Sequence, residues 1–262
     1  MKVNYHTHTT RCMHARGIDE EYVKSAIKGG FDILGFSDHT PWKYDSDFVA
    51  HMRMPMSQLS EYLDSIRSLR EKYKDQIKIL VGLECEYYEC YHENLKKLIE
   101  DNQLDYVIFG NHYNKTDEIR DYFGFTKDEA KLNEYVDSSI KGMESGVYAY
   151  FAHPDLYMNI YGEFDELARS AAHKICSTAK RLDMILEYNL GGVRYGAKGR
   201  ECGYPCDDFW KVAAEYKNKA IVGVDAHDNT DLEDKELFDE AVAYLESLGL
   251  EVVNEIPLRR YE

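Results

Sequence analysis

Short runs of apolar, β-branched and aromatic residues alternate with longer amphipathic stretches along the whole chain. Seven runs have the length and composition of buried strands: Val3–Tyr5, Ile33–Phe36, Ile77–Leu83, Tyr106–Phe109, Tyr148–Phe151, Met184–Tyr188 and Ala220–Val224. Between these runs, apolar residues recur at three- and four-residue steps, as they do in Ser57–Lys74, which predicts helices with one buried face. The pattern therefore predicts a repeated strand–helix unit.

A strand–helix repeat requires crossover connections, and these produce a parallel sheet. For 262 residues and seven strands, this favours an α/β fold of the TIM-barrel type, a distorted seven-stranded (β/α)7 barrel. No Gly/Ser linker or low-complexity tract divides the chain, so we predict a single domain over residues 1–262. The longest irregular segment, Asn189–Asp208, is rich in glycine and is predicted to be an active-site loop.

Histidines and carboxylates stand at or just after the ends of the predicted strands. Nine of them are candidate metal ligands: His6, His8, His14, His39, Glu84, His112, His153, Asp225 and His227. Because the strands of a parallel barrel all end on one face, groups that follow them converge on one pocket. Imidazole combined with carboxylate suits zinc, manganese or iron. Nine donors exceed what one ion takes, so we expect at least two ions, and three if most donors bind.

Spacing within the set gives two further predictions. In His6-Thr7-His8 both imidazoles point to one side of an extended backbone, so both can hold one ion. Glu84 is an acid among histidines, and its two oxygens make it the candidate for a bridge between two ions.

The charge of the chain narrows the range of partners. A formal net charge of −16 disfavours nucleic acid and anionic membranes, so a small phosphorylated metabolite is the expected partner. No apolar run approaches the roughly 20 residues of a membrane span, and the first residues do not resemble a signal peptide. These features predict a cytoplasmic protein, and the sequence leaves the oligomeric state open.

The order of the motifs resembles that of the polymerase and histidinol phosphatase (PHP) superfamily over nearly the whole chain. The motifs are His6-Thr7-His8, His14, Ser37-Asp38-His39, Gly82-Leu83-Glu84, His112, Ala152-His153-Pro154 and Asp225-Ala226-His227. The resemblance implies a distorted seven-stranded β/α barrel with three adjacent divalent transition metal ions (Zn, Mn or Fe). It implies one ion held by His6, His8, Glu84 and Asp225, a second by Glu84, His112 and His153, and a third by His14, His39 and His227.

Other segments resemble the histidinol-phosphatase branch of this superfamily, among them Met52–Pro55, Gly82–Tyr87 and Glu187–Asn189. The resemblance implies a metal-dependent phosphoric monoester hydrolase that converts L-histidinol phosphate to L-histidinol and phosphate in histidine biosynthesis. The segment Asn114–Phe123 departs from the branch, so another sugar or nucleotide phosphate stays open as the substrate. A non-catalytic or proofreading accessory module of a polymerase assembly is the alternative of another class, which the acidic charge disfavours.

Roles in catalysis and substrate binding follow from these motifs. We predict Glu84, Asp225, His227 and Arg194 as catalytic residues, and Arg194, Arg53 and Asn111 as substrate-binding residues. Arg194 lies in the glycine-rich segment after the sixth strand, where its planar guanidinium could hold phosphate. Glu86 and Asp117 are the candidates for holding the amine of histidinol.

Overall fold

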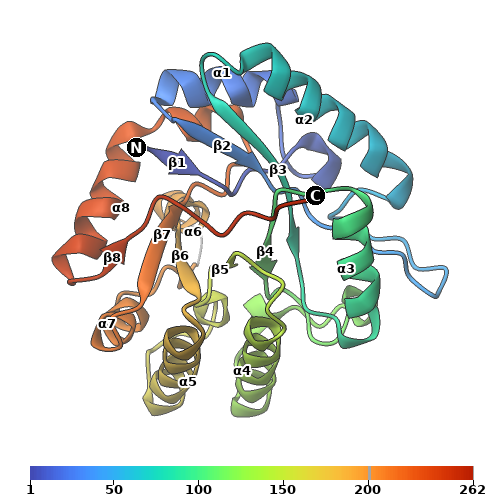
Figure 1. The fold of residues 1–262 in the computed structure, drawn as a ribbon. Coiled ribbons are helices and arrows are strands. Elements are labelled where there is room, and N and C mark those ends of the chain that lie inside the picture. The colour runs from blue at the N-terminus through green and yellow to red at the C-terminus, as the bar shows by residue number, and fades with distance from the viewer. Residues whose placement is uncertain (200–201, 262) are drawn as a thin grey trace.

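The computed structural model describes residues 1–199 and 202–261. Within these residues, eight parallel strands form one curved sheet in which neighbours in sequence lie side by side (Figure 1). The strands are β1 (Val3–Asn4), β2 (Ile33–Phe36), β3 (Lys78–Cys85), β4 (Tyr106–Gly110), β5 (Tyr150–Ala152), β6 (Ile185–Asn189), β7 (Lys219–Gly223) and β8 (Glu251–Val252). The helices are α1 (Asp19–Gly29), α2 (Leu59–Tyr73), α3 (His92–Asp101), α4 (Glu129–Glu144), α5 (Glu166–Leu182), α6 (Leu190–Ala197), α7 (Asp207–Glu215) and α8 (Lys235–Ser247).

The predicted strand count of seven was wrong, because the described residues contain an eighth strand, β8. Its two residues pair with Lys219 and Ala220 at the beginning of β7. A strand this short gives no alternation of apolar and polar positions, so the pattern could not reveal it. Beyond the carboxyl ends of β1 and β7, a parallel bridge between Thr7 and Ala226 brings the chain segments that follow these two strands together. The sheet is therefore curved like that of a TIM barrel.

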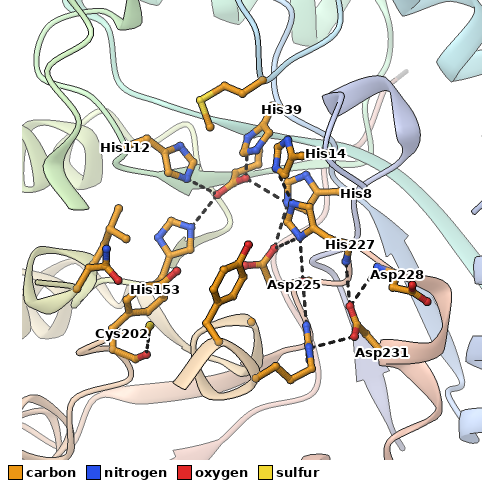
Figure 2. Close-up of a pocket in the computed structure, with 18 of the residues that line it drawn as sticks. His8, His14, His39, His112, His153, Cys202, Asp225, His227, Asp228 and Asp231 are labelled. Carbon is orange, nitrogen blue, oxygen red and sulfur yellow. Dashed lines mark hydrogen bonds and ion pairs between the residues drawn. The ribbon is translucent and has the colours of Figure 1, made fainter. Parts of the chain in front are cut away.

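The loops that follow the carboxyl ends of the strands line one pocket (Figure 2). The helix α2 packs against β3, the strand that follows it. The predicted helix Ser57–Lys74 is present as α2, and its buried side chains include Leu63, Ile66 and Leu69. Among the described residues, the structure shows no helix with the length and apolar character needed to cross a membrane.

The segment predicted as a long irregular loop after β6 contains a helix, which corrects that prediction. The Asn189 side chain caps α6 by accepting a hydrogen bond from the Gly192 amide at 3.0 Å. Gly192 is required by close approach, because a Cβ there would lie 2.3 Å from the Tyr204 carbonyl oxygen. Residues 200 and 201 of this segment lie outside the described residues.

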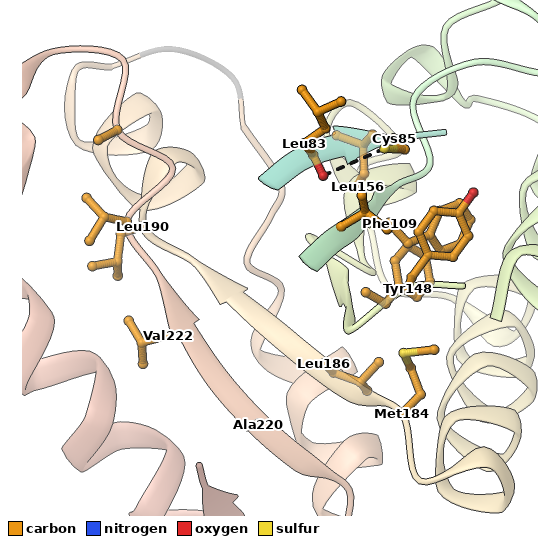
Figure 3. Packing of buried hydrophobic residues seen from close by; sticks show 14 of the residues in the cluster. Leu83, Cys85, Phe109, Tyr148, Leu156, Met184, Leu186, Leu190, Ala220 and Val222 are labelled. Atoms are coloured by element: carbon orange, nitrogen blue, oxygen red, sulfur yellow. Dashed lines mark hydrogen bonds between the residues drawn. The ribbon is translucent and has the colours of Figure 1, made fainter. Parts of the chain in front are cut away.

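Alternation along the strands divides the apolar side chains between the two faces of the sheet. In β6, Ile185 packs inside the curve with the inner residues of other strands, whereas Leu186 packs outside against the helices. On the outer face, Phe109 stacks on Tyr148 and Phe151 with ring centroids 4.9 and 4.6 Å apart (Figure 3). These two cores hold the strand ends, and hence the loops at the pocket, in fixed positions.

Candidate metal centre

The inner face of the sheet turns from apolar to acidic toward its carboxyl end. In β3 the inward-facing positions are Leu80, Gly82 and then Glu84, whose side chain is 1% exposed. Gly110 of the neighbouring strand makes room for this carboxylate, because a Cβ there would lie 2.3 Å from Glu84 Oε1. The strand register therefore points Glu84 into the pocket, and the glycine beside it keeps that space open.

The nine predicted ligands converge at the carboxyl ends of the strands, and Figure 2 shows most of them around one space. They are His6, His8, His14, His39, Glu84, His112, His153, Asp225 and His227, and each lies within 3.5 Å of another member. Groups of three whose ligand atoms all lie within 4.8 Å of one another include His6–His8–Asp225 and His14–His39–His227. The sequence prediction that these side chains meet is thus matched by the geometry.

The first group consists of His6, His8 and Asp225. The Nε2 atoms of the two histidines are 3.1 Å apart and lie 3.4 and 3.2 Å from Asp225 Oδ1. Ligands bound tetrahedrally at the usual 2.0–2.2 Å are about 3.4 Å apart. Glu84 Oε2 lies 3.5 Å from each of the two nitrogens. The spacing therefore fits one divalent ion between these four side chains.

The two oxygens of Glu84 face different partners. Oε1 lies 3.2 Å from His112 Nε2 and 2.9 Å from His153 Nε2. Oε2 lies 3.0 Å from His39 Nδ1, on the side of the group that also contains His14 and His227. Glu84 thus stands between groups of donors, as a bridging ligand would.

Unpaired oxygens provide an independent test of the fit to cations. Glu84 Oε2 and Asp225 Oδ1 are buried and have no hydrogen-bond partner among the described residues. A buried carboxylate oxygen without a partner is costly. Both atoms face imidazole nitrogens, and carboxylate with imidazole is the donor set of zinc, manganese and iron sites. The residues present therefore fit divalent ions.

The carboxylates and some of the histidines have pKa values that favour the form that binds a metal ion. Burial alone would raise the pKa of Glu84, but the neighbouring His112 and His6 outweigh burial and hold this pKa well below its ordinary value. Burial lowers the pKa of His39 and that of His227 to about 3. Burial alone would also lower the pKa of His8 and that of His112, but Asp225 and Glu84 outweigh burial and raise these values to about 9 and about 10. Ionised carboxylate and neutral imidazole are the forms that bind a metal ion, so a bound ion would have to displace the protons of these two rings.

Two buried carboxylates, which the sequence analysis did not predict as partners of the histidines, support the imidazole rings from outside. Glu187 Oε1 lies 2.8 Å from His6 Nδ1, and Glu86 Oε1 lies 3.0 Å from His112 Nδ1. Such contacts fix the tautomer and orientation of an imidazole ligand. The signal in the sequence was an acid at an inward-facing strand position, since Glu187 follows Ile185 by two residues.

Backbone strain coincides with the cluster. His153 directly follows β5 and Asp225 lies two residues after β7, and their φ values are 34° and 50°. Residues other than glycine rarely adopt positive φ, and such strain gathers at functional sites. Both residues are held in place by their neighbours, since the His153 amide donates to Glu187 Oε2 at 3.1 Å.

The pocket above the cluster has a volume of about 620 Å³. Besides the histidines, its lining contains three basic side chains, Arg16, Arg194 and Lys198. Its walls also contain Tyr122, Tyr195, Tyr204, Met52 and Leu156, and Asp228 and Asp231 lie on the same side as Arg194. The pocket can therefore accept an anion close to the cluster and still offer aromatic and acidic surface to the rest of a ligand.

Arg194 of α6 lines this pocket, and three of its hydrogen bonds and ion pairs are to protein groups. Nη2 donates to the carbonyl oxygens of Val224 at 2.6 Å and Asp225 at 3.1 Å, and Nε lies 3.1 Å from Asp231 Oδ1. Nη1 is buried and has no hydrogen-bond partner among the described residues. The arginine is thus oriented by the protein, and Nη1 is its one nitrogen without a protein partner among the described residues.

The structure corrects the predictions for Arg53 and Asn111, neither of which is in the pocket lining found among the described residues. Asn111 is 1% exposed and donates to Tyr135 O at 3.2 Å and Ser139 Oγ at 2.9 Å. Its amide therefore fixes the loop to α4. Arg53 is 2% exposed and surrounded by protein groups.

Glu86 and Asp117, predicted to hold a substrate amine, are the partners of Arg53. Arg53 Nη2 lies 2.7 Å from Glu86 Oε1, and Arg53 Nε lies 2.9 Å from Asp117 Oδ2. Burial alone would raise the pKa of Glu86, but Arg53 and His112 outweigh it and hold the pKa below its ordinary value. Both acids are buried within the protein, so the pocket offers Asp228 and Asp231 instead.

The fold and the cluster define a TIM-barrel-like α/β protein with a site for divalent ions. The family model of the PHP domain matches residues 4–191. The chain therefore belongs to the PHP domain family. The matched part contains seven of the nine candidate ligands, and the other two, Asp225 and His227, lie in the loop after β7.

Curated relatives extend the match beyond this segment. The chain is 33% identical over 254 residues to the probable histidinol-phosphatase of Schizosaccharomyces pombe, covering 87% of this chain and 81% of the relative. It is 28% identical over 237 residues to the probable histidinol-phosphatase of Deinococcus radiodurans, covering 85% of each chain.

A solved structure shares the fold. This is histidinol phosphate phosphatase from Lactococcus lactis in complex with zinc, L-histidinol and phosphate, which has a TM-score of 0.75 to this chain. The match covers 99% of both chains at 19% sequence identity. That structure therefore shares the fold of this chain over 99% of its length.

Proposed function

We propose that the protein is a metal-dependent phosphatase that hydrolyses a small phosphate monoester, with L-histidinol phosphate as the substrate. The observation that carries this proposal is the position of Glu84 between groups of imidazoles, directly below a pocket that contains an arginine with a free donor. The names of the curated relatives support the choice of substrate. The products would be L-histidinol and inorganic phosphate.

The proposed centre holds three divalent ions, each zinc, manganese or iron. His6, His8, Glu84 and Asp225 would hold the first, and Glu84, His112 and His153 the second. His14, His39 and His227 would hold the third. Support comes from the separations of their donor atoms, which fit ligands that share an ion.

Bound divalent ions would neutralise the phosphoryl oxygens and supply hydroxide at neutral pH. The protein would contribute orientation and charge. Glu187 accepts from Nδ1 of His6, so Nε2 of that ring is left free to face the cluster. Arg194 would donate through Nη1 to a phosphoryl oxygen, and its bonds to the Val224 and Asp225 carbonyls hold it ready. Glu84, Asp225, His227 and Arg194 are accordingly the proposed catalytic residues.

The remainder of the substrate would lie against the tyrosines and acids of the pocket wall. The amine of histidinol carries a positive charge, and Asp228 and Asp231 are the pocket acids outside the ligand cluster. An imidazole ring can pack on Tyr122 or Tyr204. A single domain over residues 1–262 belongs to the same proposal and is supported by the one sheet that joins all eight described strands. A cytoplasmic location is also part of the proposal.

A panel of phosphate monoesters tests this proposal. The panel contains L-histidinol phosphate, a sugar phosphate, a nucleoside monophosphate and a chromogenic aryl phosphate, each assayed for phosphate release with added Mn²⁺ or Zn²⁺. We expect the highest kcat/KM for L-histidinol phosphate. Equal kcat/KM for all four esters would reduce the proposal to a general phosphatase, and a sugar or nucleotide phosphate at the top would replace the substrate.

A further inference from the structure

The metal cluster is connected to a second, deeper group of charged side chains that does not line the pocket. At its centre is Arg53, between Glu86 and Asp117, and the exposed fractions of these three residues are 2%, 1% and 4%. Charged residues are almost never buried to this extent unless they are paired. Three buried charges beside a catalytic centre therefore require an explanation.

The contacts form a continuous chain that ends at a proposed metal ligand. His112 Nδ1 lies 3.0 Å from Glu86 Oε1, and its other nitrogen faces Glu84 Oε1 at 3.2 Å. Arg53 donates to both oxygens of Glu86, at 2.7 Å through Nη2 and 3.0 Å through Nη1. The guanidinium thus fixes the plane of the carboxylate, and the carboxylate fixes the ring of His112.

Glu86 has no freedom to move away from His112. Its Oε2 also accepts from Trp42 Nε1 at 2.9 Å. Arg53 is held in turn, because Nη1 donates to the Thr40 carbonyl at 3.1 Å and Nε pairs with Asp117 at 2.9 Å. Asp117 accepts from the hydroxyl of Tyr44 at 2.7 Å.

The same group joins three loops at the carboxyl end of the sheet. Arg53 lies between β2 and α2, Glu86 follows β3, and Asp117 lies between β4 and α4. Two of these loops also form the pocket wall, through Met52 next to Arg53 and Tyr122 beyond Asp117. A change at Arg53 therefore reaches both a metal ligand and the wall that faces the substrate.

We propose that Arg53 is a positioning residue, which acts through Glu86 to orient His112 for the second metal ion and to hold the loops of Met52 and Tyr122 in place. The inference rests on the proposed function, because it takes His112 as a metal ligand. It replaces the direct contact between Arg53 and substrate that the sequence suggested. The lysine ammonium is a single point charge and cannot reproduce the two parallel bonds to Glu86.

Metal binding by the whole protein, without substrate, tests the inference. The protein is stripped with a chelator and titrated with Zn²⁺ in competition with a chromogenic chelator. The variants are Arg53→Lys, which keeps the charge, and Glu86→Gln, which removes the carboxylate. The control is Arg70→Lys, because Arg70 of α2 pairs with Asp105 at the opposite end of β4, far from the ligands that follow that strand.

We expect both variants to lose roughly 10- to 100-fold in affinity for one of the ions, which is the range for removal of an outer carboxylate–histidine contact. The affinity of both variants for the other ions should equal that of the native protein. The Arg70→Lys protein should bind every ion with native affinity. Saturating metal should restore most of kcat in Arg53→Lys, while KM stays raised because the pocket wall has moved. Such a split between KM and kcat is not expected of a residue that only stabilises the fold.

Unchanged affinity for every ion in both variants would overturn the inference, even if their melting temperatures fall. An equal loss for all ions would also overturn it, since that result indicates general loosening of the fold. A native protein that binds no divalent ion would instead overturn the proposed metal centre itself. Failure to hydrolyse L-histidinol phosphate would leave this metal titration, and hence the inference, unaffected.

Discussion

Replacing Arg194 by alanine should weaken catalysis by the amount expected for one lost contact. Three of the arginine's contacts are to the protein, and Nη1 is the nitrogen left for phosphate. Removal of one preorganised donor to a transition state lowers the rate by roughly 10²–10³, equivalent to about 2.7–4 kcal/mol. We therefore expect kcat/KM for the substrate to fall by roughly 10²–10³ in Arg194→Ala.

The same substitution removes two hydrogen bonds that support the end of β7. Each such bond contributes about 0.5–1.5 kcal/mol net, so the free energy of unfolding should fall by about 1–3 kcal/mol. Arg181→Ala is the matched control, because Arg181 pairs with Glu144 on the exposed surface, with side chains 57% and 47% exposed. Pairs of this kind contribute only about 0–1 kcal/mol.

The assay is steady-state phosphate release at saturating metal, accompanied by elemental analysis and thermal unfolding of each variant. Elemental analysis separates the two effects, because Arg194 also bonds to the backbone of Asp225, a proposed ligand. A variant with full metal content and kcat/KM within a few-fold of the native value would refute the proposed phosphate contact. Arg194 would then be a structural residue that orders the end of β7.

Four other outcomes follow from the same geometry. Elemental analysis after growth with ample metal should find more than one divalent ion per chain, and one ion or fewer would contradict the three-ion centre. Glu84→Ala should lose more activity than His14→Ala, because Glu84 faces several donor groups and His14 one; equal losses at saturating metal would remove the bridging role. Arg53→Met should lower the free energy of unfolding by about 3–5 kcal/mol, since two buried carboxylates lose their cation, and a change under 1 kcal/mol in denaturant titration would show that they need no partner. Metal removal by a chelator should lower the melting temperature, because bound ions stabilise the folded state; an unchanged melting temperature would exclude tight binding.

Much of the fold was predictable because the strands are buried and the helices are amphipathic. Parallel strands covered on both faces read as continuous apolar runs, and seven of the eight described strands were located in this way. The eighth, β8, is two residues long and is defined by its pairing with β7. No local pattern encodes such a pairing, so the sequence could not supply it.

The convergence of the candidate ligands was predictable, because the order of the parallel strands fixes where the residues that follow them lie. Residues that follow parallel strands must meet, and the nine predicted ligands do meet. The roles of Arg53 and Asn111 could not be predicted in this way, because a loop residue can turn toward the pocket or into the protein. Arg53 turns inward toward Glu86, and only the packing of three loops decides that direction.

Phosphate release from L-histidinol phosphate, measured as a function of the divalent ions supplied per chain, tests the central claim most directly. The protein is stripped of metal and reconstituted stepwise with Mn²⁺ or Zn²⁺ before each assay. We predict no turnover in the metal-free protein, and a rate that rises with added ion and reaches a plateau at about three equivalents. No release of phosphate at any metal content, or release that does not depend on metal, would contradict the account.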